Sequence, residues 1–171
     1  MSHQLSKHAR NLYARFLQTA DRGQDLLLLA VRVYWGWQFA QTGWGKFENI
    51  HQVAEFFASL GIPSPAANAW FVAVLELVGG VLIFVGLASR PTAFLLTANM
   101  SVAFYAADRE ALMSIISDPE KFYGAAPYTF LFASLLVLFF GPGKFALDVL
   151  FRRKGTKENR QEKTFARAAR V

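Results

Sequence analysis

The stretch from Leu26 to Lys46 constrains the fold most, because it is mostly apolar and about long enough to cross a bilayer, yet contains Arg32. One set of residues recurs at helical steps of three and four and forms a single stripe: Arg32, Trp35, Gly36, Phe39, Gly43 and Lys46. A guanidinium keeps its proton in such a place, so Arg32 needs a charged partner, a path to the interface or a wet cavity.

Three more apolar runs accompany this stretch. The chain of 171 residues is 54% hydrophobic and contains 17 phenylalanines, which is too apolar for an ordinary soluble domain. A soluble helical protein would need polar faces on these runs, and residues 78–88 and 130–140 have none. The pattern predicts an all-α membrane protein: a bundle of four transmembrane helices at about 26–45, 68–88, 91–107 and 125–141, with short interfacial helices.

The segments around these runs divide the chain into three parts. Residues 1–25 are basic and weakly amphipathic, which predicts a cytoplasmic helix on the inner leaflet. Residues 26–150 form the four-helix domain, in which residues 47–60 predict an interfacial helix. Residues 151–171 are basic and are expected to be a disordered cytoplasmic tail.

The distribution of bases predicts the orientation in the membrane. Both termini and the turn at Arg90 are basic, whereas loops 46–66 and 108–124 together are net acidic. Lys and Arg concentrate on the cytoplasmic side of membrane proteins. We therefore expect a multi-pass protein of the inner membrane with both termini in the cytoplasm. The first 25 residues contain no signal-peptide pattern.

Polar residues on three of the predicted crossings fall at similar depths. At about 1.5 Å per residue, Arg32, Glu76 and Asn99 lie roughly 10, 18 and 12 Å from the cytoplasmic ends of their helices. An arginine side chain can span the difference between Arg32 and Glu76, which predicts an ion pair between them. The pair has two compatible interpretations: it fixes helix register, with Asn99 as an interhelical hydrogen bond, or it forms a proton or anion site. Gly79 and Gly80 favour close helix approach.

Several functional classes are disfavoured by the sequence. The chain has no cysteine, which excludes disulfides and thiolate chemistry. His51 has only Glu55 at metal-binding spacing, so we expect no metal site and no covalently bound cofactor. The net charge of +6 is accompanied by no nucleic-acid recognition motif, so nucleic acid is not an expected partner. Phosphate-binding loops and hydrolase triads are also missing.

Three motifs occur in order along residues 26–150. They are Arg32-x3-Gly36-x2-Phe39-x3-Gly43-x2-Lys46, then Glu76-Leu77-Val78-Gly79-Gly80 with Gly86-Leu87-Ala88-Ser89-Arg90, and finally Gly141-Pro142-Gly143-Lys144-Phe145-Ala146-Leu147-Asp148. Together they resemble the DoxX family of small four-helix membrane proteins. The family includes the large subunit of thiosulfate:quinone oxidoreductase and a membrane partner of a superoxide dismutase–sulfurtransferase assembly. The resemblance implies fold more than activity.

The buried charges and the resemblance lead to a first hypothesis: a quinone-linked redox subunit, oxidising a sulfur anion such as thiosulfate. The expected catalytic residues are Glu76, which exchanges protons, and Arg32, which holds an anionic oxygen. The expected quinone-binding residues are Trp35, Phe39, Lys46, Trp70 and Asn99.

The alternative hypothesis is a non-catalytic membrane anchor that docks a soluble oxidoreductase. In that case the polar residues only specify the bundle, and the partners are membrane lipid and a soluble or membrane subunit. A small transporter is a third hypothesis and ranks last, because the sequence has no clear inverted repeat.

Overall fold

The computed structural model describes residues 2–149, with side chains at residues 13, 15–17, 19–20 and 23–149. The predicted tail at residues 151–171 lies outside this range. The described part is entirely helical, which confirms the all-α prediction. Its helices are α1 (Ser2–Glu48), α2 (Ile50–Ser59), α3 (Pro65–Val85), α4 (Ser89–Ala107), α5 (Arg109–Met113), α6 (Pro119–Gly124) and α7 (Ala126–Phe140).

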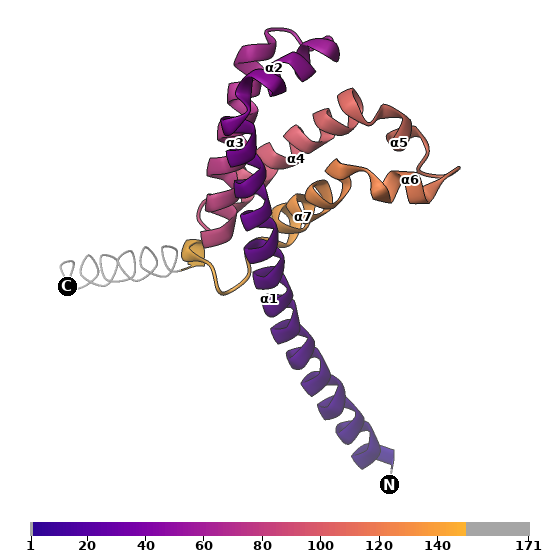
Figure 1. The fold of residues 1–171 in the computed structure, drawn as a ribbon. Coiled ribbons are helices and arrows are strands. Elements are labelled where there is room, and N and C mark those ends of the chain that lie inside the picture. Colours follow the sequence, from indigo (N-terminus) through magenta and orange to yellow (C-terminus); the bar gives the residue numbers. More distant parts are fainter. Residues whose placement is uncertain (1, 150–171) are drawn as a thin grey trace, which may run out of the picture.

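Helix α1 is longer than the predicted crossing. It runs without interruption from Ser2 to Glu48, so residues 2–25 and the first apolar run form one helix. The N-terminal part of α1 projects out of the helical body (Figure 1). The location of residues 1–25 on a membrane surface stays a prediction. Helix α3 begins at Pro65, three residues before the predicted start, with the proline in its first turn.

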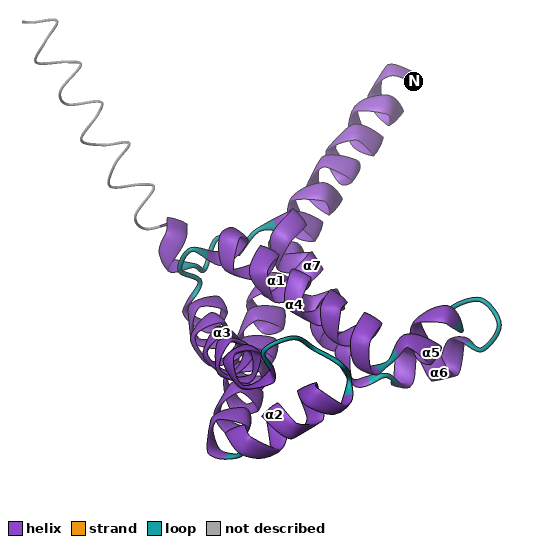
Figure 2. Ribbon diagram, turned by 90° about the horizontal axis from the view of Figure 1, so that it is seen from above, coloured by secondary structure: helices purple, strands orange, loops and turns teal. Residues whose placement is uncertain are grey.

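The long helices form two pairs that diverge from a common end (Figure 1). Helix α3 packs along the C-terminal half of α1, and α7 packs along α4. Helix α2 lies at the far end of the first pair, where it packs on α3, and the short helices α5 and α6 lie at the far end of the second pair (Figure 2). The divergence places these connecting helices around the open end of the bundle.

Glycines bring the backbones of α1 and α3 into direct contact. A Cβ atom on Gly36 would lie 2.6 Å from the backbone nitrogen of Phe84, and one on Gly43 would lie 2.7 Å from the Cα of Leu77. On the opposite helix, a Cβ on Gly80 would lie 2.7 Å from the carbonyl oxygen of Gly36. Small residues permit this kind of approach between membrane helices. The contact confirms the expected role of Gly80 in close helix packing.

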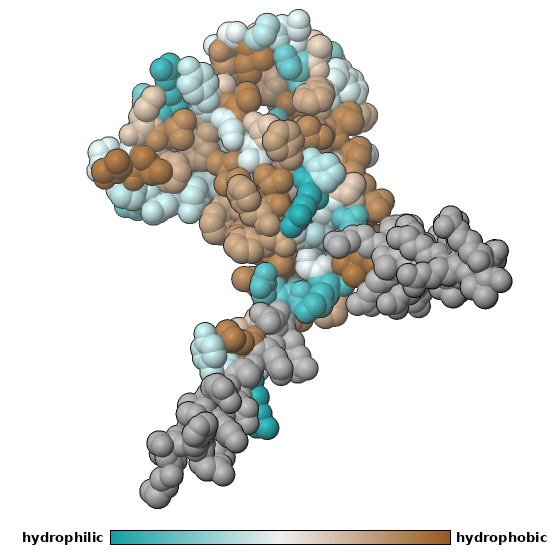
Figure 3. All heavy atoms as spheres, turned by 180° about the vertical axis from the view of Figure 1, so that it is seen from behind, coloured by the Kyte–Doolittle hydropathy of each residue, from teal (hydrophilic) through white to brown (hydrophobic). Residues whose placement is uncertain are grey.

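Apolar side chains cover the outside of the bundle as well as its core. The four long helices each expose large apolar residues, including Trp37, Phe71, Val78, Phe94 and Phe139. In the space-filling view, brown hydrophobic residues cover much of the surface of the body (Figure 3). Soluble monomers rarely expose such extensive apolar surface, which is typical of membrane or partner-binding surfaces.

Length and composition identify one clear membrane-crossing helix in the described residues. Helix α3 is 21 residues long and reaches a mean hydropathy of 2.1. Helix α7 is apolar but only 15 residues long. The apolar half of α1 is interrupted by Arg32, Gln38 and Lys46, which lowers its hydropathy.

The segment Gly141–Asp148, which follows α7 and contains the third sequence motif, closes the end where the helix pairs meet. Asp148 accepts hydrogen bonds from the backbone N–H groups of Ala88, at 2.8 Å, and Ser89, at 2.9 Å, so it caps α4 from a distant part of the chain. Burial alone would raise the pKa of Asp148, but these hydrogen bonds and the Arg32 charge lower it below its usual value. Lys144 adds an ion pair to Asp25, at 2.7 Å.

Two glycines on α1 provide a test of the close helix contact. Gly43→Ala should destabilise the fold by about 1–3 kcal/mol, because the new methyl group meets the backbone of Leu77. Gly45→Ala is the matched control, because a Cβ there has nothing within 4 Å and alanine favours the helix. Thermal unfolding of the purified protein in detergent would measure both. Equal unfolding temperatures for the two variants would contradict the packing.

Candidate functional site

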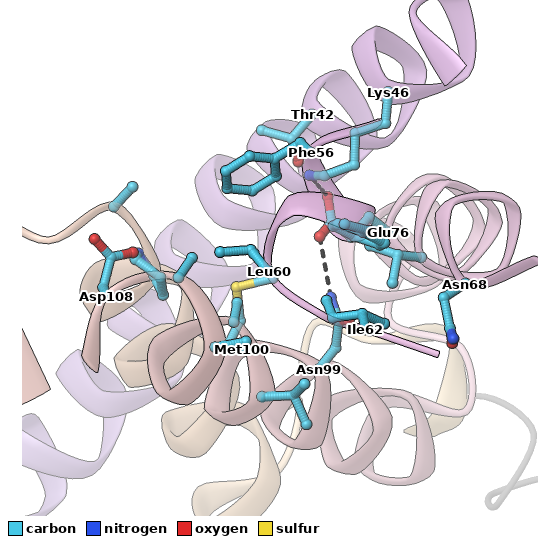
Figure 4. A pocket seen from close by; sticks show the side chains of 18 of the residues that line it. Thr42, Lys46, Phe56, Leu60, Ile62, Asn68, Glu76, Asn99, Met100 and Asp108 are labelled. Atoms are coloured by element: carbon cyan, nitrogen blue, oxygen red, sulfur yellow. Dashed lines mark hydrogen bonds and ion pairs between the residues drawn. The ribbon is translucent and has the colours of Figure 1, made fainter. Parts of the chain in front are cut away.

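A cavity of about 410 Å³ lies between the diverging helix pairs. Most of its lining is apolar and comes from α1, α2, α3, α4 and α7 (Figure 4). On α4, the lining includes Ala103, Ala106 and Ala107, whose small side chains leave space opposite α2. Phe56 and Phe57 of α2, together with Leu60 directly after this helix, line the facing side. The volume lies in the range of small-molecule and cofactor sites.

Three polar side chains from three helices meet at this cavity. The Oε2 atom of Glu76 is ion-paired with the Nζ atom of Lys46, and its Oε1 atom accepts a hydrogen bond from the Nδ2 atom of Asn99 at 3.0 Å (Figure 4). Glu76 is only 2% exposed, whereas the Lys46 side chain is 29% exposed. Each carboxylate oxygen thus has one partner, and the ammonium group keeps further N–H donors available.

The packing of α1 explains why Lys46 reaches Glu76. Gly43 lies against Leu77 and Ala73 of α3, so the next turn of α1 brings Lys46 beside Glu76. Asn99 of α4 then completes the cluster. The predicted interhelical hydrogen bond of Asn99 is therefore confirmed, with Glu76 as its partner.

The predicted ion pair between Arg32 and Glu76 is wrong. Arg32 is 1% exposed and donates from Nη2 to the carbonyl oxygen of Phe145, at 3.0 Å. Its guanidinium lies against Gly86, where any Cβ atom would collide with it. Gly86 is ten residues from Glu76 along the chain, which corresponds to about 15 Å along a helix. Arg32 and Glu76 therefore belong to separate polar clusters.

The cluster around Arg32 connects the segment after α7 to α1 and α3 and has a structural role. Asp148 supplies opposite charge near Arg32, while Gly86 accepts a backbone hydrogen bond from Asp148 at 2.9 Å. The Nε and Nη1 atoms of Arg32 and the hydroxyl of Ser89 are buried without a hydrogen-bond partner in the described residues. Arg32 lies outside the cavity lining.

The three predicted ring-site aromatics also lie outside the cavity lining. Trp35 and Phe39 pack edge-on against Phe130, with ring centroids 5.1 and 4.7 Å apart. Trp70 packs edge-on against Phe47, also at 5.1 Å. Phe130 itself lines the cavity, so Trp35 and Phe39 support the wall from behind.

Sequence reasoning did not assign the cavity residues of α2 and late α4 to a site. The apolar face of α2 matched an interfacial helix, which concealed its second contact with the bundle interior. The closely spaced alanines at positions 103, 106 and 107 could have indicated the cavity, because their small side chains leave space beside α4. Asp108, which follows them and also lines the cavity, appeared only as part of an acidic loop.

Comparison with known proteins places this bundle in a family. Residues 27–109 match the DoxX family. Through this segment, the chain belongs to the DoxX family. The match contains Lys46, Glu76 and Asn99, together with Arg32, and confirms the family predicted from the motifs.

Two relatives extend the comparison. The Bacillus subtilis protein named "Putative oxidoreductase CatD" is 39% identical over 70 residues, which cover 41% of this chain and 51% of that protein. This chain thus matches about half the length of that relative. An uncharacterized protein of Haemophilus influenzae is 27% identical over 135 residues, which cover 77% of this chain and 87% of that protein. No solved structure gives a significant match.

The polar cluster gives this DoxX cavity a defined chemical capacity. Lys46 offers N–H donors and positive charge, Glu76 offers a carboxylate that can act as a proton acceptor, and Asn99 holds that carboxylate in place. The mostly apolar lining lowers the effective dielectric constant around these groups, which strengthens their electrostatic interactions. The cavity can therefore accept a ligand with a polar oxygen and an apolar body.

A pair of double-mutant cycles tests the assignment of charge partners. Lys46→Met and Glu76→Gln should be coupled by about 0.5–3 kcal/mol in unfolding free energy, because the two side chains form an ion pair. Arg32→Gln and Glu76→Gln should add to within roughly 0.5 kcal/mol, because their sites are separate. Unfolding in detergent would measure both. Coupling between Arg32 and Glu76, together with additivity between Lys46 and Glu76, would contradict this assignment and support the ion pair between Arg32 and Glu76.

Proposed function

We propose that this protein is a quinone-linked redox subunit of the inner membrane. The observation that carries the proposal is an apolar cavity with an ion-paired carboxylate at its wall. Its membership in the DoxX family and its partial similarity to a protein named as an oxidoreductase support a redox-related role.

The proposed membrane arrangement has four crossings, formed by the C-terminal half of α1 and by α3, α4 and α7. Exposed apolar side chains on all four helices support this arrangement. The end of the bundle closed by Arg32 and Asp148 would face the cytoplasm, as would both termini, because bases concentrate there. Helices α2, α5 and α6 would then lie at the opposite face.

The cavity fits a quinone in size and in chemistry. A volume of about 410 Å³ accommodates a substituted ring, and the apolar lining suits its body. Lys46 and Asn99 can hydrogen-bond a ring oxygen at the same wall. A bound quinone would supply the redox chemistry by accepting two electrons and two protons.

The residues of this chain would bind the ring and move protons. Lys46 would donate a hydrogen bond to a ring oxygen and stabilise negative charge on it. Glu76 would exchange a proton with the same oxygen, and Asn99 would keep its carboxylate oriented. Lys46 thus takes the electrostatic role that the sequence had assigned to Arg32.

The proposed electron donor is an inorganic sulfur anion such as thiosulfate, reacting from outside the cavity. Lys46 is already neutralised by Glu76, and Asp108 adds a further negative charge to the lining. The cavity therefore favours an uncharged ring over a dianion. The anion would react at the outer face or on a partner subunit, which would then pass electrons to the ring.

A non-catalytic anchor is the second candidate function. The projecting part of α1 exposes Tyr13, Phe16 and Leu17 at helical spacing, which offers a docking face for a soluble oxidoreductase. In this alternative the Lys46–Glu76–Asn99 cluster only fixes the bundle, and the cavity takes no quinone.

Quinone retention separates the two candidates. The protein purified in mild detergent should release quinone on solvent extraction and mass analysis, and Glu76→Gln should lose most of it. Ala106→Phe should lose it as well, because the larger side chain fills the cavity while the polar cluster stays intact. Glu55→Gln, an exposed acid on α2, is the matched control and should retain quinone.

Folding is checked for each variant by its unfolding temperature and by gel filtration. Absence of quinone from the wild type, or its full retention in both well-folded cavity variants, would favour the anchor.

A further inference from the structure

We propose that Asp108 is a second proton-exchanging carboxylate of the cavity, which connects Glu76 to water at the end where α2, α5 and α6 lie. The proposal deepens the redox function above and rests on its use of the cavity. It assigns a positioning role in proton transfer to a residue outside the Lys46–Glu76–Asn99 cluster.

The first observation is that the described residues leave Glu76 almost no direct contact with water. Its side chain is 2% exposed, and its two oxygens are held by Lys46 and Asn99. The closed end of the bundle is filled by Arg32 and by the Gly141–Asp148 segment. A proton that Glu76 gives to a ligand must therefore be replaced through the cavity.

The second observation is the composition of the cavity lining. Its titratable side chains in the described residues are Lys46, Glu76 and Asp108. The other polar lining residues, which are Thr42, Asn68 and Asn99, do not exchange protons near neutral pH. Asp108 is thus the carboxylate in the lining that is available for a second step.

The third observation is the conformation of Asp108. It lies at the junction of α4 and α5, where an aspartate usually caps the following helix, but its side chain makes no capping hydrogen bond. It has no ion pair among the described residues either. The neighbouring Arg109 lies over the ring of Tyr105, 5.3 Å from its centroid, and Glu110 pairs with Lys121. Asp108 is half-buried, and its carboxylate has no ion-pair partner among the described residues.

The close-up view places Asp108 across the cavity from Glu76, with Leu60 and Met100 drawn between them (Figure 4). Because both carboxyl groups line one cavity, water inside it can carry a proton from one to the other. Reduction of the quinone to quinol takes up two electrons and two protons, one proton on each ring oxygen. For the oxygen beside Glu76, a proton from water at the rim would pass to Asp108, then to Glu76 and then to the ring, while the other oxygen would take its proton from water in the cavity. The two electrons would come from two sulfur anions such as thiosulfate, which join through a new S–S bond, and quinol oxidation would reverse the proton flow.

The test follows protonation of Glu76 without any turnover. The full-length protein is purified in detergent, freed of quinone by extraction, and subjected to rapid pH jumps across the range in which it stays folded. Infrared spectroscopy records the carboxylic-acid C=O band of Glu76, which is assigned by its loss in Glu76→Gln. Asp108→Asn should slow its appearance by about tenfold or more without changing its final amplitude.

Two matched variants control this experiment. Asp108→Glu keeps a carboxyl group at the same place and should restore the rate. Glu120→Gln removes an exposed acid from the same connection and should leave the rate unchanged. Unfolding temperatures show whether each variant is intact.

An unchanged rate in well-folded Asp108→Asn would overturn the proposal, as would the absence of any Glu76 band. Because the experiment contains no quinone, its outcome is independent of quinone retention. A slowed rate in a protein that never holds quinone would support the proton route and contradict the redox function. Quinone retention with an unchanged rate would support the redox function and contradict the route through Asp108.

Discussion

The backbone contact between α1 and α3 determines the rest of the structure. Gly36 and Gly43 on one helix and Gly80 on the other let the two backbones meet, and this contact fixes one register. A helix displaced by a residue or two would place Cβ atoms into the opposite backbone. Because charges on these helices can pair only with what the register puts opposite them, the glycines determine the electrostatics of the bundle.

The register produces two polar clusters with different properties. At the closed end, Arg32 donates a hydrogen bond to the carbonyl oxygen of Phe145 and lies near Asp148. Asp148 in turn caps α4 by accepting hydrogen bonds from backbone N–H groups at the start of that helix. At the open end, Lys46 and Glu76 pair beside a cavity. Burying opposite charges seldom increases stability over an apolar core, which agrees with the ligand-binding role proposed for the second cluster. Divergence of the helix pairs forms the cavity in which the proposed ligand would lie.

The sequence predicted the all-α class, the DoxX family and most helix positions, because long apolar runs and glycine-rich turns are local signals. It also singled out Glu76, Lys46 and Asn99, which the structure brings together in one cluster. The sequence did not predict the pairing of Glu76 with Lys46. The depth of a residue in the membrane, counted from the end of its helix, carries an error of several ångströms, whereas backbone contacts between the helices determine which residues lie opposite each other. The sequence did not predict the cavity for a related reason. The empty space between the helices depends on how the two helix pairs diverge, and the sequence of a single helix does not determine this divergence. The roles of the site residues in quinone chemistry stay predictions.

The most direct test of the central claim is photoaffinity labelling with a quinone that carries a photoreactive azide on its ring. The protein is illuminated with this probe in detergent, digested, and analysed by mass spectrometry, with excess unlabelled quinone as competitor. We expect competed labelling of cavity residues such as Phe57, Met100 and Ala103, which line the cavity together with Glu76. Competed labelling confined to the residues around Arg32, Trp35 or Trp70 would contradict it.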